Sequence, residues 1–222
     1  MPLFRRRGDQ EIADDGEEFD SPQADQPANA EAEAAAAEPG RRRPLDAGEV
    51  GPDADASLTR LDLGGLRVPV VPGIELRVEL NDQRQPIAAT LVSPRGAVQL
   101  IAFAAPRSEG IWDDVRRELA ESVRAGGGRA EEVPGPFGTE LRAVLRQVGP
   151  DGKTREEQVR FVGFDGPRWF LRATFSGPAA TDRAAAELLE TLVLRAVVVR
   201  GTEPMAPRDP IPLRLPPQAP RL

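Results

Sequence analysis

The chain contains no histidine, no cysteine and no tyrosine, and Lys153 is its only lysine. Without histidine and cysteine, neither a Ser-His or Cys-His nucleophilic pair nor the usual zinc site can form. Histidine is also the side chain that most often carries protons near neutral pH. Carboxylate chemistry, serine–lysine chemistry and hard-cation binding by acidic residues remain. We therefore expect a non-enzymatic protein without a cofactor or a metal site.

Other absences concern the cellular compartment. A chain without cysteine forms no disulfide, which is typical of a reducing cytoplasm. No apolar region of a secretory signal follows the N-terminal arginines, because the chain turns acidic there. The longest apolar runs, such as residues 98–105, are far shorter than the ~20 residues of a membrane span. We expect a cytoplasmic protein.

The net charge of −7 is unevenly distributed. Residues 1–58 hold 15 acidic and 6 basic side chains and so carry −9, whereas residues 59–222 hold 21 acidic and 23 basic ones and carry +2. The charge and the shortage of large apolar residues predict that 1–58 form a disordered acidic tail. The aromatic and basic side chains nearest the N-terminus are Phe4, Arg5, Arg6 and Arg7. They suit at most a weak peripheral contact with anionic lipid or RNA, at ~1 kcal/mol per charge.

Residues 59–203 have the pattern of an α+β domain. Apolar alternation and turn residues predict strands at 75–80, 86–92, 97–105, 130–133, 141–148, 157–164, 168–175 and 196–199. The short connections between neighbouring strands favour antiparallel pairing, and Asp165-Gly166 is a hairpin signal.

Two helices are expected among these strands. Apolar residues four apart, Ile111, Val115, Leu119 and Val123, predict the first helix, with Ser108 as its N-cap. Ser176-Gly177-Pro178 opens the second, and its predicted apolar face is Ala184, Ala185, Leu188, Leu189 and Leu192. The result is an α+β fold, mainly an antiparallel sheet of about seven to eight strands with two main helices. This order resembles the Mog1/PsbP-like sandwich, an analogy of fold that does not carry function.

Residues 204–222 form a third segment, with seven prolines in 19 positions. So many prolines exclude a helix or a central strand and favour an extended chain. Ile211, Leu213 and Leu215 alternate with Pro212 and Arg214. We expect residues 205–215 to dock on the core and the last few to be free.

Few short motifs point to chemistry. Gly152-Lys153-Thr154 resembles the end of a phosphate-binding loop, but Gln147 occupies the position of the first glycine and a strand follows. A tight turn accounts for these residues without a nucleotide.

A set of arginines with one tryptophan is the candidate interaction surface. Its members are Arg142, Arg146, Arg160, Arg168, Trp169 and Arg172. Alternation along the strand places Arg168, Phe170 and Arg172 on the face opposite Leu171 and Phe175. Such a surface suits a protein partner or stacking on single-stranded bases. The more ordinary interpretation is that the arginine stems only cover apolar surface.

Several segments together resemble one family. They are residues 61–66 (LDLGGL) with 71–73 (VPG), 104–112 (AAPRSEGIW), 135–138 (GPFG) with 140–141 (EL), 162–163 (VG) with 165–172 (DGPRWFLR) and 175–177 (FSG), and 198–201 (VVRG) with 203–209 (EPMAPRD). The set resembles the actinobacterial DUF3710 family over about residues 58–217. The resemblance implies a cytoplasmic, actinobacterial protein of unassigned function, and it supplies no catalytic or binding residue.

These observations lead to one functional hypothesis and an alternative. We expect a protein-interaction or scaffold module with an unknown protein partner, built as a tail (1–58), an α+β domain (59–203) and a proline-rich tail (204–222). The alternative is RNA or single-stranded DNA binding through the Arg/Trp surface, although the near-neutral charge of the domain does not favour it. That alternative predicts an affinity that falls steeply with salt.

Overall fold

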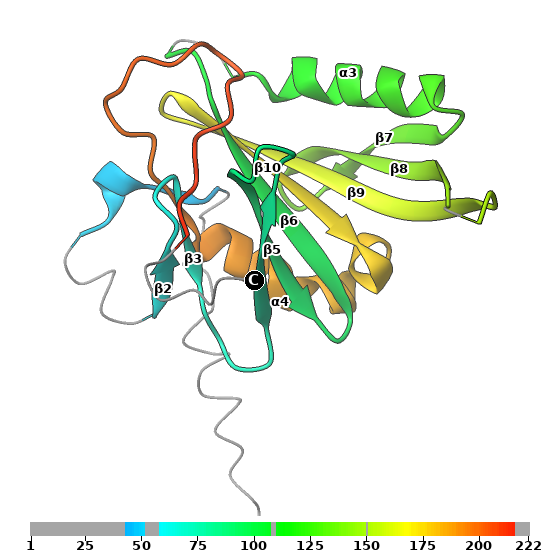
Figure 1. Ribbon diagram of the computed structural model, residues 1–222, viewed down its shortest axis with the longest axis horizontal. Coiled ribbons are helices and arrows are strands. Elements are labelled where there is room, and N and C mark those ends of the chain that lie inside the picture. Colours follow the sequence, from blue (N-terminus) through cyan, green and yellow to red (C-terminus); the bar gives the residue numbers. More distant parts are fainter. Residues whose placement is uncertain (1–42, 52–57, 108–109, 150, 216–222) are drawn as a thin grey trace, which may run out of the picture.

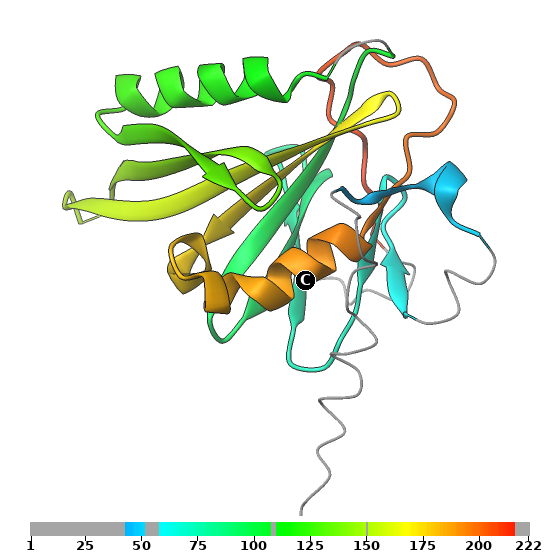
Figure 2. The ribbon, with the colours of Figure 1, turned by 180° about the vertical axis from the view of Figure 1, so that it is seen from behind.

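A computed structural model describes residues 43–51, 58–107, 110–149 and 151–215. The predicted disorder of the first 42 residues, the contact through Phe4 to Arg7 and the cap at Ser108 lie outside these ranges. The described residues form an α+β fold with a large antiparallel sheet, a small sheet and two α-helices (Figures 1 and 2). None of the helices in these ranges is long and apolar enough to cross a membrane.

The large sheet has seven strands in the order β4-β5-β6-β10-β9-β8-β7. They are β4 (Glu75–Leu80), β5 (Pro86–Ser93), β6 (Gly96–Ala104), β7 (Arg129–Gly135), β8 (Gly138–Val148), β9 (Thr154–Gly166) and β10 (Trp169–Ser176). Two meanders, β4 to β6 and β7 to β10, are joined by the pairing of β6 with β10. Every neighbouring pair is antiparallel, which confirms the predicted fold class.

The hairpin between β9 and β10 turns later than the sequence predicts. Gly166 pairs with Trp169, so Asp165 and Gly166 belong to β9 and the turn is Pro167-Arg168. Arg168 has a φ of 62°, in the left-handed region that such a turn requires.

The small sheet has the order β1-β11-β3-β2. Its strands are β1 (Leu45–Asp46), β2 (Arg60–Asp62), β3 (Leu66–Pro69) and β11 (Val197–Val198), and the 3₁₀ turn η1 (Ala47–Glu49) follows β1. The prediction that the acidic tail is disordered throughout 1–58 is therefore wrong for residues 43–51. Leu45 is buried and its strand pairs in parallel with β11, so one apolar side chain and a shared ladder order this short segment.

Two helices cover opposite faces of the large sheet. Helix α3 (Trp112–Ala125) packs over β7, β8 and β9, whereas α4 (Arg183–Arg195) lies on the other face with the small sheet. Helix α4 is preceded by a 3₁₀ turn, η2 (Gly177–Ala180), and Asp182 caps it by accepting a hydrogen bond from the Ala184 amide. Leu188, expected on its buried face, is 38% exposed.

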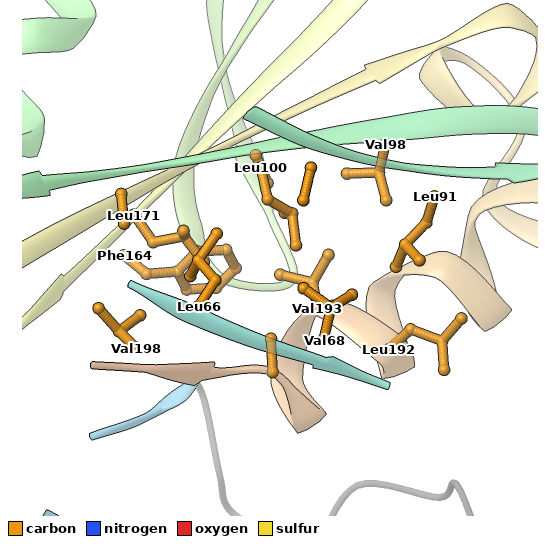
Figure 3. Packing of buried hydrophobic residues seen from close by; sticks show 14 of the residues in the cluster. Leu66, Val68, Leu91, Val98, Leu100, Phe164, Leu171, Leu192, Val193 and Val198 are labelled. Carbon is orange, nitrogen blue, oxygen red and sulfur yellow. The ribbon is translucent and has the colours of Figure 1, made fainter. Parts of the chain in front are cut away.

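The main core lies between the large sheet and the layer formed by α4 and the small sheet. Figure 3 shows Leu66 and Val68 of β3 facing side chains of the large sheet such as Leu100, with Val193 of α4 beside them. A second core under α3 contains Trp112, Phe161 and Phe170 among others. Phe170 and Leu171 are adjacent on β10 and both are buried, so β10 has a core on each face.

The C-terminal segment docks along the free part of β6. Strand β5 pairs with β6 only as far as Leu100, and the C-terminal segment pairs with β6 beyond it. The Ile211 amide donates to Ala102 O at 2.8 Å, and the Arg208 amide donates to Ala104 O at 2.7 Å. Ile211 and Leu213 are buried. This docking brings Arg208 within hydrogen-bonding distance of Glu118 on α3.

Candidate functional site

The structure does not assemble the six predicted residues into one surface. Trp169 is fully buried, its Nε1 donates to Asp46 Oδ2 at 2.8 Å, and the Arg43 guanidinium lies 5.8 Å from its ring centroid. Arg168 sits at the hairpin tip and donates to Gly201 O, whereas Arg146 is exposed and pairs with Glu156. The tryptophan is therefore part of the core and presents no face to a nucleic-acid base.

Arg160 lies in a buried ion triad on the α4 side of the sheet. It is 5% exposed and pairs with Glu140 at 3.2 Å and with Glu190 at 2.6 Å. Its guanidinium also stacks on Phe175, 4.1 Å from the ring centroid. The Arg160 guanidinium therefore makes its contacts with groups inside the fold.

A polar pocket of about 390 Å³ adjoins this triad, and Arg142, which is exposed, lies on its wall. Burial raises the pKa of Glu140 despite the opposing Arg160 charge. Glu140 Oε1 is buried without a hydrogen-bond partner, and a Cβ added at Gly135 would lie 2.2 Å from it. Gly135 covers that oxygen and Arg160 holds the other, while Glu140, Arg160 and Glu190 all contribute to the lining of the pocket.

Arg172 lies on the opposite face of the sheet, under the edge of α3. Its guanidinium is 5.7 Å from the ring centroid of Phe103, and its Nε is buried without a hydrogen-bond partner. Burial lowers the pKa of Arg172, and no neighbouring carboxylate of the described residues offsets that effect. Among the six predicted residues, Arg172 is a half-buried cation with which no carboxylate of the described residues pairs.

Arg172 lines a crevice of about 310 Å³ between α3, the sheet and the C-terminal segment. We call it the α3 crevice. Its lining residues are Phe103, Ile111, Val115, Glu118, Leu119, Ser122, Phe170, Arg172 and Arg208. Its floor is aromatic, because Phe103 and Phe170 stack with their centroids 6.0 Å apart.

The N-terminus of α3 is fixed by groups from other elements. Asp165 at the end of β9 accepts a hydrogen bond from the Ile111 amide at 2.8 Å, so a carboxylate distant in the sequence caps this end of the helix. Trp112 Nε1 donates to Thr139 O at 2.8 Å, and its ring stacks on Phe170. These contacts hold the helix close to the sheet at Trp112 and Val123, which are buried, while Val115 and Leu119 are only half-buried.

The rim of the crevice is polar, and its charges are already paired. Arg208 donates to both carboxylate oxygens of Glu118, at 2.7 and 2.8 Å, which ties the C-terminal segment to α3. Glu118 is therefore neutralised at the rim, while Arg172 has no carboxylate on the floor. Chemically, the α3 crevice suits a group that brings a negative charge together with an apolar side chain.

Sequence reasoning found one part of this site and missed the rest. Alternation on β10 correctly placed Phe170 and Arg172 on one face. The half-buried Val115 and Leu119 look like ordinary members of an apolar helix stripe, and Arg208 belongs to the proline-rich tail. Nothing local in the sequence indicates that these three segments meet.

The structure also bears on metal binding. Among the described residues no group of three or more acidic side chains is placed to share a metal ion. Asp113 and Asp114 on α3 pair instead with Arg116 and Arg117 one turn later.

Several solved structures are similar to this chain. The Ran-binding protein Mog1p of Saccharomyces cerevisiae has 14% identity and a TM-score of 0.39, covering 64% of this chain and 95% of that chain. Cyanobacterial PsbP (CyanoP) from Synechocystis sp. PCC 6803 has 16% identity and a TM-score of 0.36, covering 68% and 98%. LpqN of Mycobacterium tuberculosis, involved in cell envelope biogenesis, has 12% identity and a TM-score of 0.30, covering 64% and 90%. No curated protein matches this chain.

A family model described as "Protein of unknown function (DUF3710)" matches residues 44–221. The match begins one residue before β1 and runs past the docked C-terminal segment, so it covers both sheets and the α3 crevice. It agrees with the segments whose sequence resembles that family. The chain belongs to the DUF3710 family.

Proposed function

We propose that this chain is a non-enzymatic protein-interaction module and that the α3 crevice is its partner-binding site. One observation carries the proposal: the Arg172 guanidinium lies on an apolar floor, and no carboxylate of the described residues pairs with it. The partner segment we propose brings an acidic side chain to Arg172 and an apolar side chain to the half-buried Phe103, Val115 and Leu119.

The energetic reason concerns the cost of a buried charge. A guanidinium that leaves water without a counter-ion destabilises the fold. Part of that cost is already incurred in the free protein, so a carboxylate that reaches Arg172 gains a strong, partly dehydrated ion pair. Arginine and aromatic side chains are also the residues that contribute most at the centre of protein interfaces.

The shape of the crevice favours a protein segment. Its volume of about 310 Å³ is at the small end for ligand pockets, ~300–1,000 Å³. It is bordered by the exposed residues Glu118 and Ser122 of α3, so an occupant can continue across the helix surface.

The nucleic-acid alternative finds less support. Trp169 is buried in the core, and Arg160 is held between two carboxylates. No specific observation favours RNA or single-stranded DNA.

The remaining parts of the proposal rest on composition. A chain without histidine and cysteine lacks the commonest catalytic side chains, which supports a non-enzymatic role. The absence of cysteine also supports a cytoplasmic location.

Site-specific crosslinking in the cells from which the chain originates tests the proposal. The full chain carries p-benzoylphenylalanine in place of Ser122 at the crevice, and in a control in place of Leu188 on α4. We expect a partner protein to crosslink at position 122 and not at position 188. The purified partner should then bind Arg172→Gln about 30-fold more weakly than wild type, as loss of one interface charge partner costs ~2 kcal/mol or more.

Arg146→Gln provides the matched control, because it removes an exposed arginine outside the crevice. We expect it to bind the partner as wild type does. Equal crosslinking at both positions, or equal affinity of the two arginine variants, would contradict the proposed site.

A further inference from the structure

The acidic N-terminal tail contains one short segment whose chemistry matches the α3 crevice. Between residues 8 and 42, Ile12 and Phe19 are the only large apolar residues, and Phe19 is the only aromatic one. Phe19 is flanked by Glu17, Glu18 and Asp20. The segment thus carries an aromatic ring between carboxylates, whereas the crevice has an aromatic floor with an unpaired guanidinium.

The tail begins close to the crevice. The described chain starts at Arg43, whose guanidinium lies 5.8 Å from the ring centroid of Trp169. The next residue of β10 is Phe170, which lines the crevice floor on the other face of the sheet. The tail therefore starts near the end of β10 that carries Trp169, on the face of the sheet opposite the crevice.

The intervening chain is long enough to reach around that end. Residues 20–42 give 23 residues between Phe19 and Arg43. A flexible chain of this length has a root-mean-square span of roughly 25–30 Å, and its full extension is roughly 75 Å. A tethered segment at such a span has an effective concentration on the order of 1 mM at its site.

The charge on Arg172 favours the same encounter. Residues 1–42 hold 11 acidic and 5 basic side chains and carry −6, whereas residues 43–222 hold 25 acidic and 24 basic ones and carry −1. Within the crevice, Arg208 already neutralises Glu118, so Arg172 provides the unbalanced charge. The folded part as a whole therefore does not attract the tail, and the electrostatic attraction is local, at the Arg172 guanidinium on the crevice floor.

We propose that residues 17–20 dock in the α3 crevice of the same chain, with the Phe19 ring against Phe103, Val115 and Leu119, which are half-buried, and a neighbouring carboxylate on Arg172. The tail then occupies the site until a partner displaces it. This inference rests on the proposed function only in using the same crevice. The docked tail competes with the partner for the α3 crevice and so lowers the apparent affinity of the chain for that partner.

Paramagnetic relaxation in the full chain tests the docking. Since the chain has no cysteine, Ser21→Cys creates a single site for a nitroxide label. We expect strong broadening of the methyl signals of Val115 and Leu119, and little at Val148 and Leu188, which are exposed elsewhere. The broadening should not change when the protein is diluted, because the contact is within one chain.

Substitutions in the tail keep the test independent of folding. Phe19→Ala in the labelled chain should abolish the selective broadening, and Ile12→Ala, the matched control, should leave it unchanged. Uniform broadening of all four residues, or selective broadening that survives Phe19→Ala, would overturn the proposal. Broadening that disappears on dilution would assign the contact to a second copy and would also overturn it.

Partner binding separates this inference from the proposed function. For an effective concentration of ~1 mM and a segment dissociation constant of ~0.1 mM, Phe19→Ala should tighten partner binding about tenfold. If Phe19→Ala leaves partner affinity unchanged while Arg172→Gln weakens it, the tail inference fails and the proposed function stands. If Arg172→Gln leaves partner affinity unchanged while the tail still broadens Val115 and Leu119, the proposed function fails and the docking stands.

Discussion

Arg172 illustrates at the scale of one residue how stability and binding oppose each other. Its guanidinium stays charged, because even a pKa lowered by burial leaves arginine protonated in the physiological range. The fold therefore holds a partly dehydrated cation that contacts the ring of Phe103, and no carboxylate within the described part of the chain pairs with it. Functional sites often retain such locally unfavourable groups.

Replacing this arginine should stabilise the protein. Arg172→Met keeps a long unbranched side chain over Phe103 and removes the unpaired charge. We expect the free energy of unfolding in urea to rise by about 1–2 kcal/mol at pH 7. Arg146→Met, at an exposed position, should change it by less than about 0.5 kcal/mol. A clear loss of stability in Arg172→Met would mean that the guanidinium is stabilised in the free protein.

Glu140 should produce a specific pH dependence. Its pKa is raised in the folded protein, mainly by burial, so the folded state binds this proton more tightly than the unfolded state. The resulting stabilisation is fully present below the unfolded pKa of a glutamate, ~4.3, and is lost as the pH rises through the higher folded value.

The comparison with a neutral isostere isolates this effect. The stability of Glu140→Gln relative to wild type should increase as the pH rises from ~4, by at most ~1.4 kcal/mol per pH unit. Urea titrations at several pH values measure it. Glu121→Gln, which removes an exposed carboxylate from α3, should show no comparable slope. A difference between Glu140→Gln and wild type that is constant with pH would contradict the raised pKa.

Sequence reasoning could reach some of these residues and not others. Strand alternation was sufficient to place Arg172 beside Phe170, because that relation spans two positions. It could not reveal that Arg160 and Trp169 are buried. Their polar partners are 20, 30 and 123 residues away, at Glu140, Glu190 and Asp46.

Among the elements, α3 depends on a cap that its own sequence does not supply. Ile111 at the N-cap has no side chain able to accept a hydrogen bond, and Asp165 of β9 takes that role. A carboxylate at this end also interacts favourably with the helix dipole. The position of α3 over the sheet, and hence the width of the crevice, is thus coupled to the β9–β10 hairpin.

Removing the cap should weaken the helix measurably. We expect Asp165→Ala to lower the free energy of unfolding by about 1 kcal/mol, in the range of ~0.5–2 kcal/mol for lost caps. Amide hydrogen exchange should accelerate in the first turn of α3 before it does so in β10. Asp113→Ala removes an exposed carboxylate from the same turn and is the control. Equal effects of the two substitutions would contradict the role of Asp165.

The long elements could be predicted because each carries its own periodicity. The strands of the large sheet and the stripe of α3 were located within a few residues. Strands β1 and β11 have two residues each; β11 lies within the strand predicted at 196–199, whereas β1 was missed, since two positions define no period. They exist because the backbone of Leu45 and Asp46 pairs with β11, a contact between the two ends of the domain.

At the scale of the whole molecule, both terminal segments complete the fold. Residues 43–51 add a strand to the small sheet, and the C-terminal segment pairs with β6 where β5 no longer does. The predicted boundaries at residues 58 and 203 mark changes in composition. The backbone hydrogen bonds include residues beyond both boundaries in the folded unit.

Ile211 is the anchor through which the C-terminal segment contributes to stability. Its side chain is 4% exposed, and a Cβ added at Gly65 would lie 2.7 Å from its Cγ2, so the small sheet closes tightly over it. We expect Ile211→Ala to lower the free energy of unfolding by about 2–4 kcal/mol, through lost burial and the remaining cavity.

The same substitution should loosen the rim of the α3 crevice, because Arg208 reaches Glu118 from this docked segment. Limited proteolysis should then cleave Ile211→Ala near residues 203–209 faster than wild type, before global unfolding. Pro212→Ala is the control, since Pro212 is exposed and its neighbours Ile211 and Leu213 are the buried residues. If Ile211→Ala and Pro212→Ala are equally stable and equally resistant, the segment is not held by Ile211. In that case the C-terminal segment would not be a fixed wall of the crevice. Neither α3 nor the sheet would hold Arg208 in place without it.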